Sequence, residues 1–145
     1  MKNIIPLSLI FIFATLSANA AEKIIFDHDG GVDDFVSMTL LSCDKTYNIK
    51  AITVVPADSY KKPAISVTKK LSDLYGLKNV QISGSDFEGT NPFPDVWREH
   101  SDLMHEMDHI KNAKHNKTNT VLSASSHKHL VKLLSKNEQY VILAT

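Results

Sequence analysis

Apolar and polar positions divide the chain into short β-branched runs and longer segments with helical spacing. Residues 49–55 are rich in β-branched side chains and predict a buried strand. Pro63 and Gly76 bracket a helical segment, because proline is tolerated in a first helical turn and glycine commonly ends a helix. Gly, Asn and Pro punctuate residues 84–94, which predicts a loop. Strands are predicted at residues 23–26, 49–55, 80–83 and 140–143, and helices at 33–43, 64–75, 97–111 and 123–134.

The alternation of strands and helices predicts the fold class. Parallel strands need a long crossover, usually a helix, and these crossovers are right-handed. We therefore expect an α/β fold, a mostly parallel β-sheet flanked by helices as in Rossmann-like open sheets, with ligands at the carboxyl ends of the strands. The last predicted strand has no helix after it, although parallel sheets are covered on both faces, so the chain is interpreted as an incomplete amino-terminal half of a larger domain. The helix at 33–43 is expected to turn these side chains inward: Phe35, Val36, Met38, Thr39, Leu40 and Leu41.

The first 20 residues are predicted to form a secretory signal peptide. Lys2 gives a positive amino-terminal region, residues 4–16 are apolar, and small residues at 18–20 resemble a cleavage site. The apolar stretch is short for a membrane span, although an uncleaved anchor is the alternative. We expect an exported protein, periplasmic or secreted, with no stable membrane insertion after cleavage and with residues 21–145 forming its domain.

Composition narrows the range of partners. Sixteen Lys and Arg balance sixteen Asp and Glu, so no overall field favours nucleic acid or anionic membrane. The lone Cys43 cannot form an internal disulfide, and its place at the end of an apolar helical run predicts a core position.

The candidate chemistry lies in residues 27–34, directly after the first strand. Asp27, Asp29, Asp33 and Asp34 place four like charges on one short turn with glycines between them. Such charges repel one another unless a cation neutralises them, and carboxylate oxygens suit a hard divalent ion. The sequence therefore predicts a metal site at this turn.

Three simpler interpretations of this turn are possible. An EF-hand loop starting at Asp27 needs Gly at position six and Glu at position twelve, where this chain has Val32 and Met38, so that interpretation is excluded. The opening Phe-Asp-His-Asp-Gly also resembles the first motif of magnesium-dependent haloacid-dehalogenase phosphatases, although that family gives no role to Asp33 and Asp34. An acidic helix start would explain Asp33 and Asp34 but not the two preceding aspartates.

The four acids together resemble the signature of the inosine/uridine-preferring nucleoside hydrolases. Residues 52–55 resemble the second strand of that family, and residues 141–145 resemble the strand that leads into its Leu-Ala-Thr-Gly-Pro segment, so the resemblance covers residues 23–145. It implies calcium-dependent hydrolysis of the N-glycosidic bond of a small-molecule nucleoside, giving ribose and a free base. Homo-oligomer formation is left open.

The resemblance also implies roles for individual residues. Asp29 would bind calcium and act as general base toward the attacking water, with Asp27 supporting the metal site. Asp34 would clamp calcium through both oxygens, and the main-chain carbonyl of Thr145 would be a further ligand. Asp33 would accept hydrogen bonds from the ribose hydroxyls.

The chain departs from the family pattern at two positions. Gly30 stands where the family usually has proline. Asp58 stands where the family commonly has an asparagine that contacts the ribose; it can accept a hydrogen bond from a hydroxyl but cannot donate as an amide does.

The chain also lacks the family's second half. That half carries the remaining calcium carboxylate, sugar-binding residues and the leaving-group acid. We therefore expect little or no activity from this chain alone, and a non-catalytic truncated product that binds metal or ligand is the alternative.

A second motif points to different chemistry. Residues 105–109 spell His-Glu-Met-Asp-His, the zinc-protease pattern, and His115 stands where one subgroup has a third ligand. On one continuous helix His105 and His109 would share a face. No methionine follows Met107 to form the turn that such proteases need, so a solvated, His-rich helix is favoured over a zinc metalloprotease.

Overall fold

The core of the molecule is a five-stranded parallel sheet. The computed structural model describes residues 20–87, 89–114 and 117–145. The strand order is β4-β3-β2-β1-β5, and each neighbouring pair is parallel. The strands are β1 (Glu22–His28), β2 (Tyr47–Val54), β3 (Gln81–Gly84), β4 (Thr120–Val121) and β5 (Val141–Ala144). The predicted α/β fold with a parallel sheet is confirmed. The signal peptide predicted over residues 1–20 lies outside the described residues except for Ala20.

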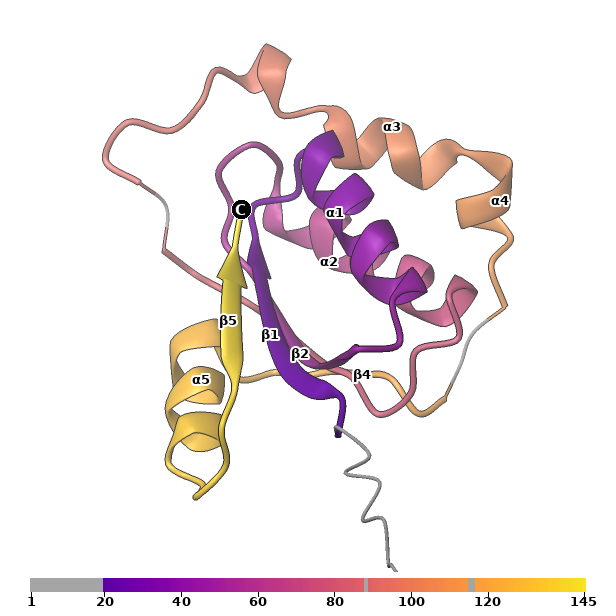
Figure 1. The fold of residues 1–145 in the computed structure, drawn as a ribbon. Helices are drawn as coiled ribbons and strands as arrows, with labels where there is room; N and C mark the ends of the chain where they lie inside the picture. The colour runs from indigo at the N-terminus through magenta and orange to yellow at the C-terminus, as the bar shows by residue number, and fades with distance from the viewer. Residues whose placement is uncertain (1–19, 88, 115–116) are drawn as a thin grey trace, which may run out of the picture.

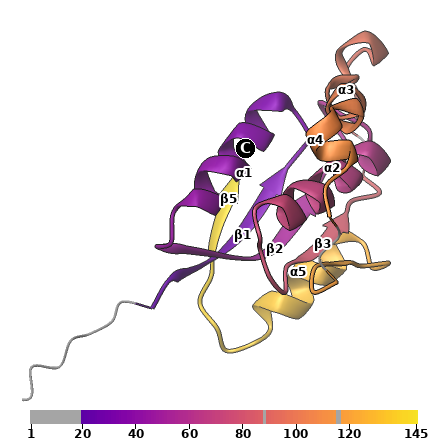
Figure 2. The same cartoon turned by 90° about the vertical axis from the view of Figure 1, so that its right-hand side faces the viewer.

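Helices lie on both faces of this sheet, as Figures 1 and 2 show. On one face α1 (Val32–Cys43) and α2 (Lys61–Leu74) pack directly on the strands, and α3 (His100–Glu106) and α4 (Asp108–Lys111) pack on α2. On the other face lies α5 (Ser126–Leu134), and a short 3₁₀ turn η1 (Asp95–Trp97) precedes α3. No helix among the described residues combines the length and apolar character that a membrane crossing requires.

The alternation of β1 distributes its side chains between two hydrophobic clusters. Ile24 and Phe26 point into the larger cluster with Phe35 and Met38 of α1, while Ile25 packs with Leu133 of α5 on the opposite face. Every one of these side chains is at most 5% exposed. Side chains of β1 are thus packed on both faces of the sheet, which holds the strand and the turn that follows it in place.

The sequence analysis missed one strand and predicted one helix where the structure has two. The two-residue strand β4 is too short to leave a pattern in the sequence. The helix predicted at 97–111 is divided, because Met107 is extended at φ −62° and ψ 131°. On a continuous helix Ile110 would lie roughly 240° around from Met104, but in the structure Ile110 is buried in the larger cluster and Met104 packs against that cluster.

Part of the apolar pattern of α1 faces outward instead of toward the core. Phe35 and Met38 are buried as expected, but Val36 is 55% and Leu40 is 67% exposed. Cys43 is exposed too, which corrects its predicted core position. These side chains lie on the side of α1 that no other described element covers.

Candidate active site

The predicted site residues gather at the carboxyl ends of three neighbouring strands. Asp27 lies near the end of β1 and Asp29 follows it, Asp58 follows β2, and Thr145 follows β5. The order β2-β1-β5 makes these ends adjacent, and Thr145 N–H donates to the Asp27 carbonyl at 3.1 Å. The Thr53 hydroxyl donates to Asp27 Oδ1. The predicted residues therefore lie together at the carboxyl ends of these strands, and their functional roles stay predictions.

Asp34 is the anchor of the acidic turn. It is 1% exposed, and its Oδ2 accepts the backbone N–H groups of Asp29, Gly30 and Gly31 at 3.1, 2.9 and 3.0 Å. Its Oδ1 accepts the Thr145 hydroxyl, so the first and last segments of the described domain meet at one carboxylate. Burial by itself raises the pKa of Asp34, but its side-chain contacts, among them the hydrogen bond from the Thr145 hydroxyl, outweigh burial and hold that pKa well below its ordinary value. Asp34 is thus an ionised group held by fixed donors.

His28 supports the turn from beneath, although the sequence analysis gave it no role. Its ring is 1% exposed, and its Nδ1 accepts the Gly30 N–H at 3.1 Å. The Thr68 hydroxyl donates to the Ala64 carbonyl at 2.7 Å and therefore accepts from Nε2 of His28 at 3.0 Å. Because one ring nitrogen contacts Gly30 of the turn and the other contacts Thr68 of α2, the His28 ring connects the turn to this helix.

Asp29 is the aspartate of this turn whose pKa is raised. Its Oδ1 accepts the Gly31 N–H and its Oδ2 accepts the Asp58 N–H, both at 3.3 Å. Burial, followed by the nearby Asp34 carboxylate, raises the pKa of Asp29 to about 6. Without a cation, Asp29 therefore retains a proton at a higher pH than an ordinary aspartate does.

Three carboxylates converge beside Gly31. A Cβ atom at Gly31 would lie 2.6 Å from Asp33 Oδ1, 2.7 Å from Asp58 Oδ2 and 3.6 Å from Asp29 Oδ1. We call this meeting point of carboxylates the Gly31 notch. The carboxylates come from the start of α1, from the segment after β2 and from the turn after β1, and they lie so close to Gly31 that a larger residue would collide with them.

The backbone conformation of the turn also requires a glycine at position 30. Its φ of +90° is closed to proline, and a Cβ there would lie 2.8 Å from the Cβ atoms of both Ser59 and Ala64. Glycine in place of the family's usual proline therefore gives this turn a backbone conformation that proline cannot adopt.

The amino end of α3 closes one side of the site. The buried Ser101 hydroxyl donates to the Gly30 carbonyl at 2.9 Å, and His100 Nδ1 lies 3.2 Å from Asp58 Oδ2. Arg98, only 5% exposed, stacks over the Tyr60 ring at 4.3 Å. The sequence analysis missed these residues because their partners lie about 40 to 70 positions away, and no local pattern marks such contacts.

The side chains of the turn offer the type of ligand that a hard cation prefers, but too few of them converge on one point. Asp27, Asp29 and Asp34 offer only oxygen ligands, which suit calcium or magnesium. Among the described residues, however, no group of three or more His, Cys, Asp or Glu side chains is arranged to hold a metal ion. Both oxygens of Asp34 already accept hydrogen bonds, so a two-oxygen clamp requires the Thr145 hydroxyl to turn away.

The zinc-protease pattern is not assembled. His105, on α3, lies 3.3 Å from the Ser66 hydroxyl and 3.4 Å from Lys70 Nζ, and exposed His109 belongs to α4, beyond the break at Met107. The expected shared helical face therefore does not exist. His115 lies outside the described residues.

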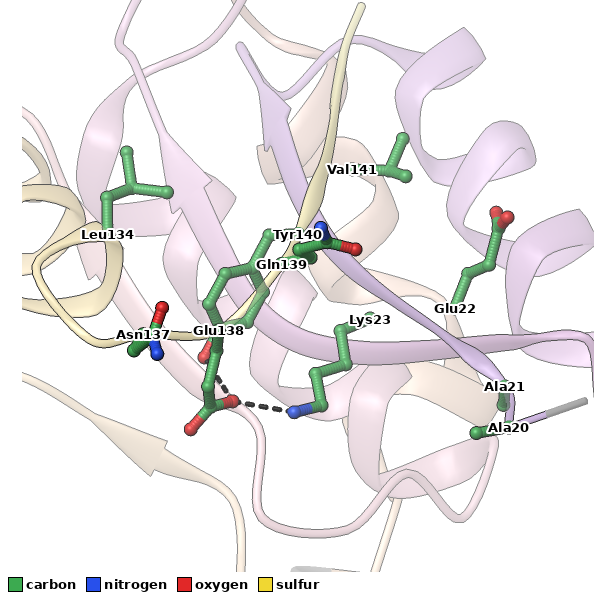
Figure 3. Close-up of a pocket in the computed structure, with 10 residues that line it drawn as sticks. All are labelled: Ala20, Ala21, Glu22, Lys23, Leu134, Asn137, Glu138, Gln139, Tyr140 and Val141. Carbon is green, nitrogen blue, oxygen red and sulfur yellow. Dashed lines mark hydrogen bonds and ion pairs between the residues drawn. The ribbon is translucent and has the colours of Figure 1, made fainter.

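A cavity of about 830 Å³ lies at the opposite edge of the sheet, at the amino ends of β1 and β5. Figure 3 shows the Lys23–Glu138 ion pair at 2.7 Å, with the Tyr140 hydroxyl also donating to Glu138 at 3.0 Å. These charged groups pair with one another, and the cavity is remote from the acidic turn.

Comparisons with known proteins show which family the chain resembles. A family model described as inosine-uridine preferring nucleoside hydrolase matches residues 24–145. The chain is similar to the inosine-uridine preferring nucleoside hydrolase from Bacillus anthracis, with a TM-score of 0.75 and 34% identity over 85% of this chain and 41% of that one. An inosine-guanosine nucleoside hydrolase gives a TM-score of 0.55 at 19% identity over 85% and 39%, which shows the fold alone. A search of curated proteins gave no match. The chain thus spans less than half the length of these two structures.

Proposed function

The chain belongs to the inosine-uridine preferring nucleoside hydrolase family, and we propose that it provides the amino-terminal half of a calcium-dependent nucleoside N-ribohydrolase. The reaction is hydrolysis of the N-glycosidic bond of a ribonucleoside to ribose and free base. The family is generally metal-dependent, and calcium is the ion we propose for this chain. Family membership decides against the phosphatase and zinc-protease alternatives.

The acidic turn is the observation that supports this proposal most directly. Asp29, Asp33 and Asp58 direct carboxylate oxygens at one notch, while Asp34 is held by three backbone amides below it. Three neighbouring acceptors suit the hydroxyls of a sugar. Clustered negative charge also stabilises the oxocarbenium-like charge that develops on the sugar as the bond to the base breaks.

The proposal assigns a role to each group. Asp29, Asp34 and the Thr145 carbonyl would hold calcium, with Asp27 supporting them. Bound calcium would supply positive charge that makes a nearby water more acidic. Asp29 would accept the proton of the attacking water, a role open to an ionised carboxylate. Asp33 and Asp58 would accept hydrogen bonds from the ribose hydroxyls.

The length of the chain sets the expected level of activity. Because it spans 41% of the Bacillus anthracis structure, we expect weak calcium binding and little turnover by the chain alone. We also propose export to the periplasm or medium, with a nucleoside as the small-molecule partner. The oligomeric state stays open.

A calcium titration combined with a nucleosidase assay tests the proposal. Calorimetry should show calcium uptake that Asp29→Asn abolishes and that Asp108→Asn, a matched substitution on α4, leaves unchanged. Release of hypoxanthine from inosine or uracil from uridine should be slow, calcium-dependent and absent in Asp29→Asn. Calcium uptake without any base release would favour the non-catalytic alternative, and absence of calcium uptake would remove the proposed cofactor.

A further inference from the structure

His129 is a buried histidine at the contact between α5 and the sheet, remote from the acidic turn. The residue is only 2% exposed. Its Nδ1 lies 2.8 Å from the Ser83 hydroxyl of β3, and its Nε2 lies 3.1 Å from the amide oxygen of Gln81 on the same strand. An amide oxygen only accepts, so Nε2 carries the proton and Nδ1 accepts the Ser83 hydroxyl. These contacts therefore select a neutral ring with its proton on Nε2.

The contact of α5 with the sheet is small, so the polar contacts of His129 matter for its attachment. Ser126, in the first turn of α5, donates to the Ser83 carbonyl at 3.1 Å. Leu133, near the other end of the helix, packs with Ile25 and Ala51 in the smaller hydrophobic cluster. The amino-terminal half of α5 is thus attached through hydrogen bonds to β3, and its carboxyl-terminal half through apolar contacts.

A second proton on the ring conflicts with these hydrogen bonds. Protonated Nδ1 is a donor, and it would face a hydroxyl that already donates to it. Ser83 is fully buried, so its hydroxyl would have to find another acceptor in a place closed to water. A buried donor without an acceptor is costly, and so is a buried charge without a partner. Detachment of α5 removes both costs, because the ring then reaches water.

The charges on and just after α5 also disfavour a charged ring. Burial, followed by the positive charges of Lys132 and Lys136, holds the pKa of His129 below its ordinary value. His127 and Lys128 of the same helix are exposed. The helix therefore carries cations, and none of them stabilises a protonated His129.

The elements packed against α5 supply uncharged groups at this contact. These groups are Gln81 and Ser83 of β3, Ile25 of β1, Ala51 of β2 and Tyr140 before β5. The Tyr140 hydroxyl donates to Glu138, which pairs with Lys23. Asp86, which interacts with His127, pairs with Lys61. Both carboxylates are thus already neutralised by lysines.

We propose that His129 is a pH-sensitive latch, which holds α5 on the sheet while its ring is neutral and releases the helix when the ring is protonated. The attached helix binds the second proton more weakly than the released helix does. Release is therefore promoted as the pH falls below about 6.5, the ordinary pKa of histidine. Released α5 uncovers Ile25 and Ala51 on its face of the sheet. The latch does not depend on the hydrolase proposal.

Hydrogen exchange of the full chain tests the latch. Exchange is followed by mass spectrometry at about pH 7.5 and about pH 5.5 and corrected for the intrinsic effect of pH. Protection of α5 should fall about tenfold, because one pH unit below the ordinary pKa favours the protonated, released helix by about that factor. Protection of α2, on the opposite face, should change less than about twofold. His129→Asn keeps an acceptor for Ser83 but cannot titrate, so its α5 should be equally protected at both pH values.

A control variant and a second measurement complete the test. His127→Asn removes an exposed histidine of the same helix and should keep the wild-type response. NMR of the wild-type chain should show the His129 proton on Nε2 at about pH 7.5, and the second proton should bind over the pH range in which α5 loses protection. The latch is overturned if His129→Asn retains the pH response or if α5 stays protected after the ring is protonated. Equal loss of protection in α2 and α5 also overturns it, since the whole chain then unfolds. If His129→Asn does not fold, the NMR comparison in the wild type decides.

Discussion

Two adjacent aspartates in the acidic turn have opposite environments. Asp34 is 1% exposed and accepts four hydrogen bonds, whereas Asp33 is exposed and directs Oδ1 into the Gly31 notch. Their residue type and adjacent positions do not distinguish them, although the family resemblance implies different roles. Geometry separates them, because Asp34 holds the backbone of the turn whereas Asp33 is exposed at its surface.

Neutralising each aspartate should therefore have different effects on stability. Asp34→Asn replaces an acceptor-only group with an amide whose NH₂ group faces backbone N–H donors, and we expect it to lower the free energy of unfolding by about 3 kcal/mol. Asp33→Asn should change that free energy by less than about 0.5 kcal/mol, as exposed substitutions usually do. Urea unfolding of the two variants measures the difference. Equal losses would show that Asp34 has no special structural role.

Asp29 links calcium binding to pH. Its pKa is raised to about 6 in the folded, cation-free chain, so its contribution to stability is present below its ordinary pKa and is lost as the pH rises through about 6. Calcium requires the ionised form, so affinity for calcium should increase as the pH rises from about 5 to 7, with proton release at the lower pH. Calorimetry in buffers of different ionisation enthalpy measures that release. A calcium affinity that is constant across this range would contradict the assigned role of Asp29, and Asp108→Asn should retain the wild-type pH dependence.

At the scale of elements, the sequence predicted those features that depend on residues close together in the chain. Strands β1, β2, β3 and β5 were predicted because apolar, mostly β-branched runs mark them, and the acidic turn was predicted because its carboxylates are adjacent in the sequence. The segment from 97 to 111 was predicted as one helix because its spacing is helical. Its break is set by long-range contacts, Ser101 with Gly30 and Ile110 with the core, which no window of sequence contains.

The break at Met107 makes a prediction about zinc. His105 and His109 lie on separate helices, so the chain should bind no zinc at stoichiometric, submicromolar affinity, since tight sites require several ligands held in tetrahedral geometry. Zinc content after dialysis should be the same in the wild type, His105→Ala and His109→Ala. One zinc ion per chain, lost in both variants, would restore the metalloprotease motif as a metal site.

The whole molecule exposes an apolar surface along one side. Val32, Val36 and Leu40 form a stripe on α1 at four-residue spacing and are 47, 55 and 67% exposed. The edge strand β5 exposes Val141, Ile142 and Leu143 to between 37 and 50%. Parallel sheets are normally covered on both faces, and the chain spans less than half the length of its structural relatives. The sequence predicted the apolar character of these positions but not their exposure, because burial depends on what lies opposite.

This exposed surface should make the chain bind hydrophobic dyes. We expect the dye anilinonaphthalene sulfonate to fluoresce with the folded chain, and the double variant Val36→Lys/Leu40→Lys to reduce that signal by about half, since it interrupts the α1 stripe. The urea midpoint should stay near the wild-type value, because both side chains are already solvated. Val96→Lys, at a position 75% exposed in η1, is the matched control and should leave the signal unchanged. If the control reduces dye binding as much as the double variant does, the dye responds to apolar side chains anywhere on the surface, and the α1 stripe has no special status.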